Sequence, residues 1–230
     1  MTDGDIPLAR FVDRYTMRHE RVYPHPRERV WRALTDPAHV RAWFTEVALD
    51  LVEGGRAAFG PAGSWWETTI TALEPPRLIE FAHALPAAEA GYTRFELDEV
   101  DGGCRMTFTL HFDPRAAWPA APHDPLGGDL PGGPDTPWRP GFVGGWHDFF
   151  DRLGRVFDGL PADCIRDTST TQLAAHVAGQ LVRDEGLDAA LAERMQVVFA
   201  QADRWNELNE IYRRHIIATL PGAAGPVRSP

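Results

Sequence analysis

The middle of the chain consists of short segments in which hydrophobic and polar residues alternate, a pattern typical of half-buried β-strands. Turn sequences rich in glycine and proline, such as Glu74-Pro75-Pro76 and Asp101-Gly102-Gly103, separate these segments. Strands that follow one another through such short turns form an antiparallel meander. The sequence therefore predicts six strands, at residues 46–53, 56–59, 65–73, 77–83, 93–100 and 104–112.

A further strand and two short helices are expected before this meander. Residues 14–23 alternate loosely up to Pro24-His25-Pro26, where the prolines lack the amide hydrogens that a strand needs. From Arg27 the apolar residues follow a helical period, and Thr35-Asp36-Pro37 then joins a capping side chain to a proline suited to the first turn of a second helix. That helix should end near residues 43–44, and residues 1–13 are expected to form a tail.

A longer amphipathic helix is predicted over residues 144–158, followed by Gly159, a residue suited to a left-handed helix end. Its apolar side is expected to pack on the concave face of the sheet. Its other side is expected to face solvent, and it carries His147, Asp148, Asp151, Arg152 and Arg155.

The segment before this helix, residues 113–145, holds eight prolines and seven glycines, a composition that predicts irregular structure. It also carries Trp118 and Trp138, whose rings need an apolar neighbour. The segment could form a lid over a cavity, or it could be an insertion that packs against the C-terminal helices. The sequence favours neither alternative.

Residues 160–230 are expected to form a helical extension, with helices at 168–183 and 187–219 and a disordered end after Pro221-Gly222. The second helix carries an apolar stripe along its whole length. Such a stripe must be buried, so the helix either folds back on the preceding domain or pairs with another chain. A homodimer through residues 187–219 is therefore one expectation.

The composition narrows the function. The chain has 230 residues, enough for one domain with an extension, and a formal net charge of −10, which argues against nucleic acid and anionic membranes as partners. All 23 basic residues are arginine, which removes chemistry that depends on lysine. The isolated Cys104 and Cys164, and the absence of a long apolar run, predict a cytoplasmic protein.

Several stretches together resemble the SRPBCC superfamily, in particular its branch similar to the activator of heat-shock protein 90 ATPase. They are RVYPHPRERVWRALTDPAHVRAWF at 21–44, ALEPPRLIEF at 72–81, GGCRMTFTLHF at 102–112 and GWHDFFDRL at 145–153. The resemblance implies an α+β helix-grip fold over residues 14–159, a curved antiparallel sheet around a long C-terminal helix. It also implies a cavity between sheet and helix, which relatives use for lipids, sterols, polyketides or plant hormones and in some branches for catalysis.

Candidate catalytic groups are sparse. The nine histidines form no metal-binding motif, and His19, His25 and His39 are expected near turns or on exposed helix faces. Cys104 alternates with apolar residues and is expected to be a small core residue. His83 shares strand phase with Phe81 and should point toward the cavity, either as a satisfied core histidine or as a ligand-anchoring or acid–base group. No catalytic residue, metal or cofactor is predicted.

The preferred hypothesis is non-catalytic binding of a small hydrophobic or aromatic molecule. The alternatives are a protein-interaction module with a chaperone partner and, third, an enzyme of the cyclase or aromatase type. Strand phase does not decide whether Trp66 and Thr68, or the residues beside them, face the cavity. The predicted ligand-binding residues are Trp66, Thr68, Phe81, His83, Phe95, Phe108, Leu110, Trp146 and Phe150.

Overall fold

The computed structural model describes residues 7–60, 66–82, 91–113, 138, 140–160 and 202–221, with the backbone alone at residues 66, 141 and 202–206. The predicted helix at 168–183, the first part of the helix at 187–219, His83 and most of the 113–145 segment lie outside these residues.

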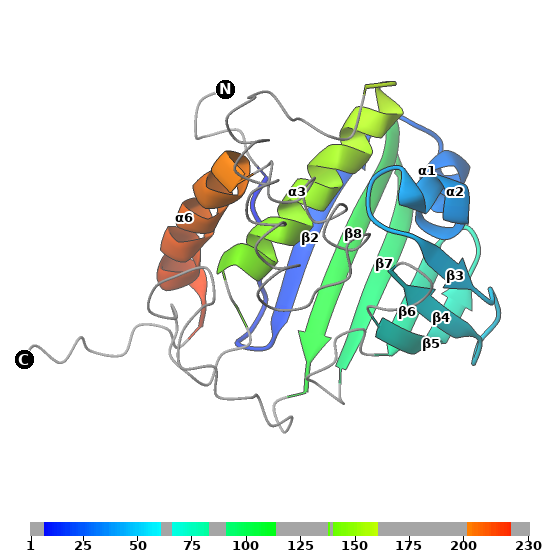
Figure 1. Cartoon of the computed structure of the whole chain (residues 1–230), viewed down its shortest axis with the longest axis horizontal. Coiled ribbons are helices and arrows are strands. Elements are labelled where there is room, and N and C mark those ends of the chain that lie inside the picture. Colours follow the sequence, from blue (N-terminus) through cyan, green and yellow to red (C-terminus); the bar gives the residue numbers. More distant parts are fainter. Residues whose placement is uncertain are drawn as a thin grey trace, which may run out of the picture.

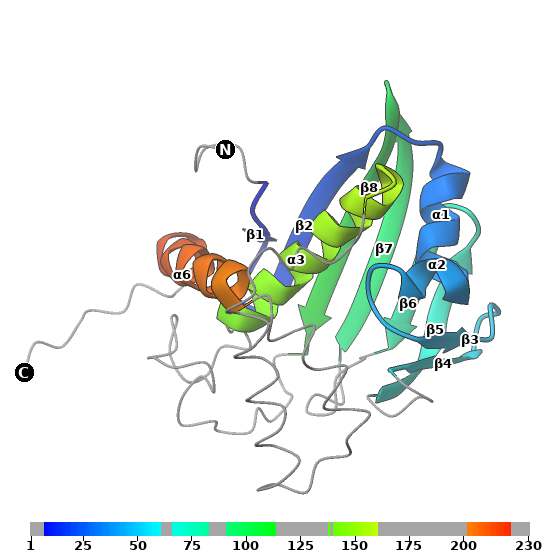
Figure 2. The same ribbon diagram turned by 45° about the horizontal axis from the view of Figure 1, so that its top comes forward.

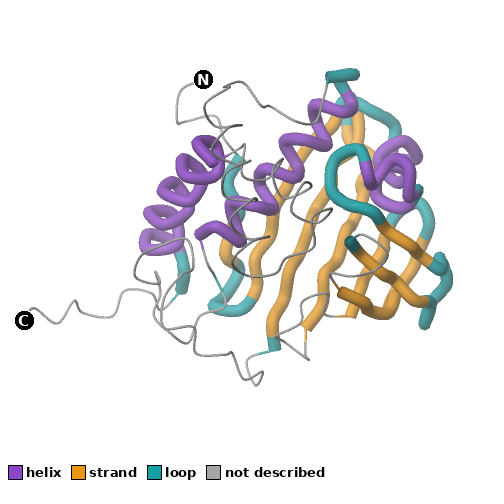
Figure 3. Tube along the Cα trace, viewed as in Figure 1, coloured by secondary structure: helices purple, strands orange, loops and turns teal. Residues whose placement is uncertain are grey.

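The described strands form one curved antiparallel sheet (Figures 1 and 3). Its order is β1-β2-β8-β7-β6-β5-β4-β3, so the predicted meander is confirmed, and the early strand β2 lies beside the last strand β8. The strands are β1 Arg10–Phe11, β2 Thr16–Tyr23, β3 Val47–Leu49, β4 Arg56–Phe59, β5 Trp66–Glu74, β6 Leu78–Ala82, β7 Gly91–Val100 and β8 Gly103–Phe112.

Two short helices follow β2, as predicted: α1 (Arg27–Thr35) and α2 (Pro37–Arg41). The side chain of Asp36 accepts a hydrogen bond from the amide of Ala38 at 2.9 Å, which satisfies one of the free donors at the start of α2. The capping pattern at Asp36 therefore places the start of α2 correctly, whereas α2 ends at Arg41 and not near residues 43–44 as predicted.

The long helix α3 (Pro140–Phe157) lies along β2 and β8 in both ribbon views (Figures 1 and 2). Its side chains Phe150 and Leu153 are fully buried, and Gly159 after it has a φ of 70°, as a left-handed helix end requires. A curved sheet that holds a long helix is the helix-grip fold, so this expectation is confirmed.

The predicted start of this helix at residue 144 is wrong, because the helix begins at Pro140. A proline is accepted in a first helical turn, where its missing amide hydrogen has no partner to lose. Gly144 also reads as a loop signal in the sequence, yet its place in the helix has a packing reason. A Cβ at Gly144 would lie 3.2 Å from the Cβ of Leu208, so glycine lets another helix approach closely.

That other helix is α6 (Ala202–Thr219), which runs beside α3 (Figure 2). Its residues Leu208, Tyr212 and Ile216 are buried within the chain, so the described part of the apolar stripe folds back on the domain. A homodimer through residues 187–219 remains a prediction for the part of that helix outside the described residues.

The expectation that the outer side of α3 faces solvent is also wrong. His147, Asp148 and Arg152 are buried with exposed fractions of 0%, 6% and 9%. The hydroxyl of Tyr212 on α6 lies 2.9 Å from His147 Nδ1, so α6 covers this residue. Arg152 Nε donates to Asp148 Oδ2 at 2.8 Å within α3 itself.

Two further segments join the core. Arg10 and Phe11, expected in an N-terminal tail, form β1, and the amide of Ala9 donates to the hydroxyl of Tyr212 at 3.0 Å. Trp138, from the proline-rich segment, is fully buried against Phe11 and Phe112, and its Nε1 donates to the carbonyl of Arg14.

Candidate functional site

Aromatic side chains from the sheet, α3 and the end of α2 meet on the concave side of the sheet. We call this group the aromatic wall. It consists of Phe44, Phe59, Phe81, Phe95, Phe108, Trp146, Phe149 and Phe150.

The deep part of the wall centres on Phe108 of β8, which has no exposed surface. Its ring centroid lies 4.5 Å from that of Trp146, 5.1 Å from Phe150 and 4.9 Å from Phe95. Tilted and edge-on contacts at these distances are the favoured geometries of aromatic pairs. The predicted residues Phe95, Phe108, Trp146 and Phe150 are therefore brought together.

The outer part of the wall is only partly buried. Phe44, Trp146 and Phe149 retain some exposed surface, and the ring of Phe44 lies 5.4 Å from Trp146 and 4.7 Å from Phe149. Phe44 also contacts Phe59, which contacts the predicted residue Phe81 at 5.5 Å. Accessible aromatic surface at Trp146 is thus continuous with the buried rings behind it.

The sequence did not decide which face of β5 points toward the core. In the structure, Ile70 is fully buried, whereas Glu67 and Thr69 are exposed. Thr68 lies on the same side as Ile70, half-buried, and its hydroxyl donates to the carbonyl of Ala82. Leu110 is buried on β8. Of Trp66 the structure describes the backbone alone, and His83 lies outside the described residues.

His19 is the residue that the sequence pattern misplaced. It was expected near a turn, but it lies on the inner face of β2 with no exposed surface. Its ring is 5.4 Å from Phe150 and 6.3 Å from Phe108, so it borders the aromatic wall. Burial, with Arg21 as a second cause, holds the pKa of His19 well below its usual value, which keeps the ring neutral. The alternation of Met17, His19 and Tyr23 was the available signal.

A polar cluster lies beside His19, between β2, α3 and α6. Arg21 Nη2 is 3.7 Å from Asp151 Oδ1, and His147 Nε2 is 3.4 Å from Asp151 Oδ2. The hydroxyl of Tyr212 accepts from Ala9 N and lies within hydrogen-bond distance of His147. Burial raises the pKa of Tyr212, so its hydroxyl stays protonated. The cluster links β2, α3 and α6 beside His19.

Nucleophilic and metal chemistry find little support in the described residues. Cys104 is buried, and burial raises the pKa of its thiol to about 11, so the thiolate is scarce at neutral pH. In the described ranges, no three His, Cys, Asp or Glu side chains are placed to hold a metal ion. The described helices include none long and apolar enough to cross a membrane.

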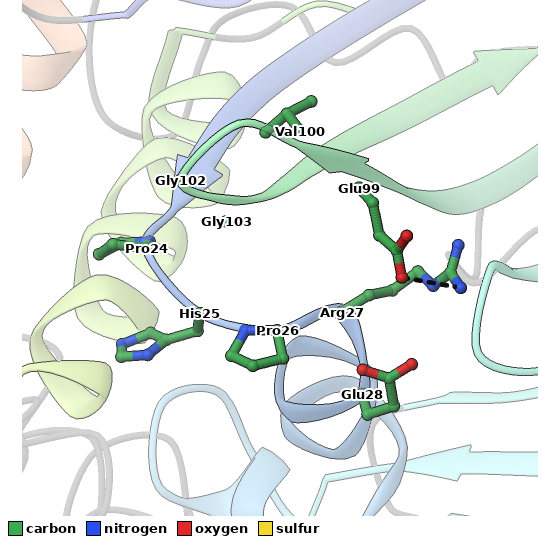
Figure 4. Close-up of a pocket in the computed structure, with 9 residues that line it drawn as sticks. All are labelled: Pro24, His25, Pro26, Arg27, Glu28, Glu99, Val100, Gly102 and Gly103. Carbon is green, nitrogen blue, oxygen red and sulfur yellow. Dashed lines mark ion pairs between the residues drawn. The ribbon is translucent and has the colours of Figure 1, made fainter.

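A separate surface pocket of about 440 Å³ lies where the turn between β2 and α1 meets the turn between β7 and β8 (Figure 4). An ion pair of 3.2 Å between Arg27 and Glu99 crosses one side of it. The ring of His25 turns away to contact Phe157 at 4.8 Å. None of the predicted ligand-binding residues lines this pocket.

The curved sheet, the enclosed long helix and the aromatic wall between them define a helix-grip protein of the SRPBCC kind. A family model described as "Activator of Hsp90 ATPase homolog 1-like protein" matches residues 24–158, more than half of the chain. The chain therefore belongs to this family, and the resemblance seen in the sequence is confirmed.

Solved structures with a similar chain path include CalU16 from Micromonospora echinospora. Its solution structure is 19% identical and has a TM-score of 0.49, covering 89% of this chain and 93% of that one. DynU16, from the dynemicin biosynthetic locus, is 20% identical with a TM-score of 0.48, covering 64% of this chain and 49% of that one. Protein MLL2253 from Mesorhizobium loti is 22% identical with a TM-score of 0.46, covering 62% and 96%. No curated protein matches the sequence.

Proposed function

We propose that the protein binds a small hydrophobic or aromatic molecule between the sheet and α3, against the aromatic wall. The observation that carries this proposal is the half-buried group Phe44, Trp146 and Phe149, which joins accessible aromatic surface to the buried rings. Sites for small molecules are mostly apolar and aromatic, with a few polar groups that fix orientation. The family fold, with its helix held over a concave sheet, supports the same assignment.

Binding without catalysis is the simpler form of this proposal. The described part of the wall offers mostly carbon surface, and the histidine in ring contact with it, His19, is held neutral. The Arg152 guanidinium also lies over the ring of Phe149, but an arginine stays protonated and is a poor proton donor or acceptor. General acid–base catalysis needs a positioned proton donor or acceptor near the reacting atoms, usually more than one. A cyclase or aromatase activity would therefore depend on residues outside the described part of the wall.

Mass spectrometry of the purified full chain tests the proposal. Under native conditions we expect an adduct that organic extraction removes and that is then identified as an apolar compound. Trp146→Ala should lower retention of the adduct at least tenfold, because it removes the largest aromatic surface at the outer edge of the wall. Tyr92→Ala is the matched control, since Tyr92 stacks on His111 away from the aromatic wall.

The proposal fails if the purified chain carries no adduct and also binds no added apolar probe such as 2-naphthol. Equal retention in the wild type and Trp146→Ala would move the site away from the wall.

The family description favours a second candidate, an interaction with a heat-shock protein 90 chaperone. A pull-down with a bacterial protein of this class, together with its ATPase rate, tests it with the full chain. A reproducible change in the ATPase rate would support the interaction. No capture and no change in rate would count against it.

A further inference from the structure

We infer that His19 is the hydrogen-bonding anchor of the ligand site, and that the ligand is a neutral aromatic molecule carrying a hydroxyl or carbonyl group. The inference rests on the proposed function, because it names a polar contact within the same site. It adds a residue that the pattern of the sequence did not suggest and a chemical class of ligand.

The position of His19 is the first argument. It projects from β2 toward α3 and contacts two rings of the wall, Phe108 and Phe150. Both rings in turn contact the half-buried Trp146, at 4.5 Å and 5.8 Å. One layer of rings therefore separates His19 from the accessible edge of the wall, and a flat ligand that enters this layer reaches the imidazole.

The second argument is that the imidazole lacks its own partner. The Val143 carbonyl lies close enough to favour the protonated ring, but neither ring nitrogen makes a hydrogen bond of ordinary geometry to a described residue. Fully buried polar groups are nearly always hydrogen-bonded in native proteins, and each exception needs a reason. A ligand that supplies the missing hydrogen bond is such a reason.

Other polar groups close to the wall are already satisfied. Trp43 Nε1 donates to the carbonyl of Ala33, the hydroxyl of Tyr23 to the carbonyl of Phe150, and the hydroxyl of Thr68 to the carbonyl of Ala82. These donors would have to give up a bond within the protein in order to bind a ligand. Among the described polar side chains at the wall, His19 gains a bond without losing one.

The groups around His19 decide which ligand chemistry fits. Arg21 from β2, His147 from α3, and Tyr212 and His215 from α6 face it. Burial, Arg21, His147 and His215 all disfavour a positive ring. A neutral imidazole has one donor and one acceptor nitrogen. It therefore matches a phenolic hydroxyl or a carbonyl, whereas a carboxylate would lose its hydration without gaining a cationic partner from His19.

Two probes of nearly equal shape test the inference, 2-naphthol and 2-methylnaphthalene. Equilibrium dialysis of the full chain measures the affinity for each. An apolar wall alone should favour the methyl compound, because burying an unpaired hydroxyl is unfavourable. The anchor should reverse this order and favour 2-naphthol by about tenfold, the usual effect of one hydrogen bond.

Replacing the ring assigns the effect to His19. His19→Leu should keep the affinity for 2-methylnaphthalene and lose the preference for 2-naphthol, whereas His39→Leu, at an exposed histidine of α2, should retain it. If His19→Leu does not fold, His19→Gln takes its place. Its amide offers a donor and an acceptor in a different position, and the preference should fall by at least threefold.

The outcomes separate the two proposals. If neither probe binds, the proposed function itself fails. If both bind and the methyl compound is favoured by the wild type, or if the replacement of His19 leaves the preference for 2-naphthol unchanged, binding stands and the anchor is overturned.

Discussion

The two sides of α3 are both buried, one against the sheet and one against α6, but the contacts differ in kind. On the sheet side, Phe150 and Leu153 meet apolar and aromatic side chains, where any well-fitting carbon surface would be favourable. On the other side, His147 meets the hydroxyl of Tyr212 on α6, and Arg152 pairs with Asp148, one turn earlier in α3 itself. Burial alone therefore does not identify which side of a helix faces the core.

The difference has a physical consequence. Hydrophobic contacts are non-directional, so the rings of the aromatic wall need no single orientation to be stabilised. Hydrogen bonds to buried groups are directional and unfavourable to leave unmade, so they fix how α6 lies on α3. On the sheet side of α3, we expect substitutions that change the shape of a side chain to be tolerated. On the α6 side, we expect a substitution that changes side-chain volume to be tolerated better than one that removes a polar group.

The largest effect is expected from Phe108→Ala on the sheet side. Removing a fully buried ring that contacts Phe95, Trp146 and Phe150 should lower the free energy of unfolding by about 3–5 kcal/mol. Urea denaturation measures this loss. Tyr92→Ala, away from the wall, should cost less than half as much, and equal losses would mean that the wall is not the centre of the core.

Arg152→Ala tests the buried polar side of α3. The Arg152 and Asp148 side chains are 11% and 8% exposed, and removing one partner of a buried ion pair should cost about 3 kcal/mol. The control is Arg105→Ala, which breaks a pair with Asp98 in which both side chains are about half exposed (45% and 51%) and should change stability by less than about 1 kcal/mol. Similar losses in the two variants would contradict the burial of this side of α3.

Tyr212→Phe removes one hydroxyl and keeps the ring. It should cost about 1–2 kcal/mol, since the amide of Ala9 and the ring of His147 both lose a hydrogen-bond partner. Hydrogen exchange should locate the loss in α6. In Tyr92→Phe, we expect a change within about 0.5 kcal/mol, and a comparable effect in both would argue against a specific role for Tyr212.

The smallest effect is a dependence on pH. Because burial holds the pKa of His19 below its usual value of 6.5, the unfolded chain takes up this proton first as the pH falls. Stability from the neutral ring is present above pH 6.5 and is lost below it, by at most about 1.4 kcal/mol per pH unit. The wild type should lose stability below pH 6.5 more steeply than His19→Leu. Parallel curves would show that His19 is not held neutral.

Much of the fold was predictable because the alternation of hydrophobic residues and the composition of the turns indicate the same strand boundaries. The alternation from Cys104 to Phe112 and the turn at Asp101-Gly102-Gly103 place β7 and β8 within two residues of their observed bounds. The pairing of β2 with β8 could not be read from alternation, since it joins segments far apart in sequence. The start of α3 was missed because Pro140 is accepted in the first turn of a helix, whereas in the sequence it belongs to a segment rich in proline and glycine.

The candidate site was partly predictable for a related reason. Strand phase was enough to find Phe95 and Phe108, and helical period was enough to find Trp146 and Phe150. The rule that places polar residues outside failed for His19 and His147. The side chains that cover His19 come from β8, α3 and α6, and Tyr212 of α6 covers His147, so the cover is distant in sequence. Phe44 could not be assigned to the wall, since its position depends on how α2 meets α3 in space.

The bonds between Ala9 and α6 also bear on how the protein can be shortened. The amide of Ala9 donates to the hydroxyl of Tyr212, and its carbonyl lies 2.6 Å from His215 Nε2, so both backbone groups of Ala9 contact a helix more than 200 positions away in the sequence. These two contacts hold the segment around Ala9 against α6 without a covalent link. Removing residues 1–9 should therefore destabilise α6 before the rest of the fold. A tag or fusion at the N-terminus is best separated from Ala9 by a spacer.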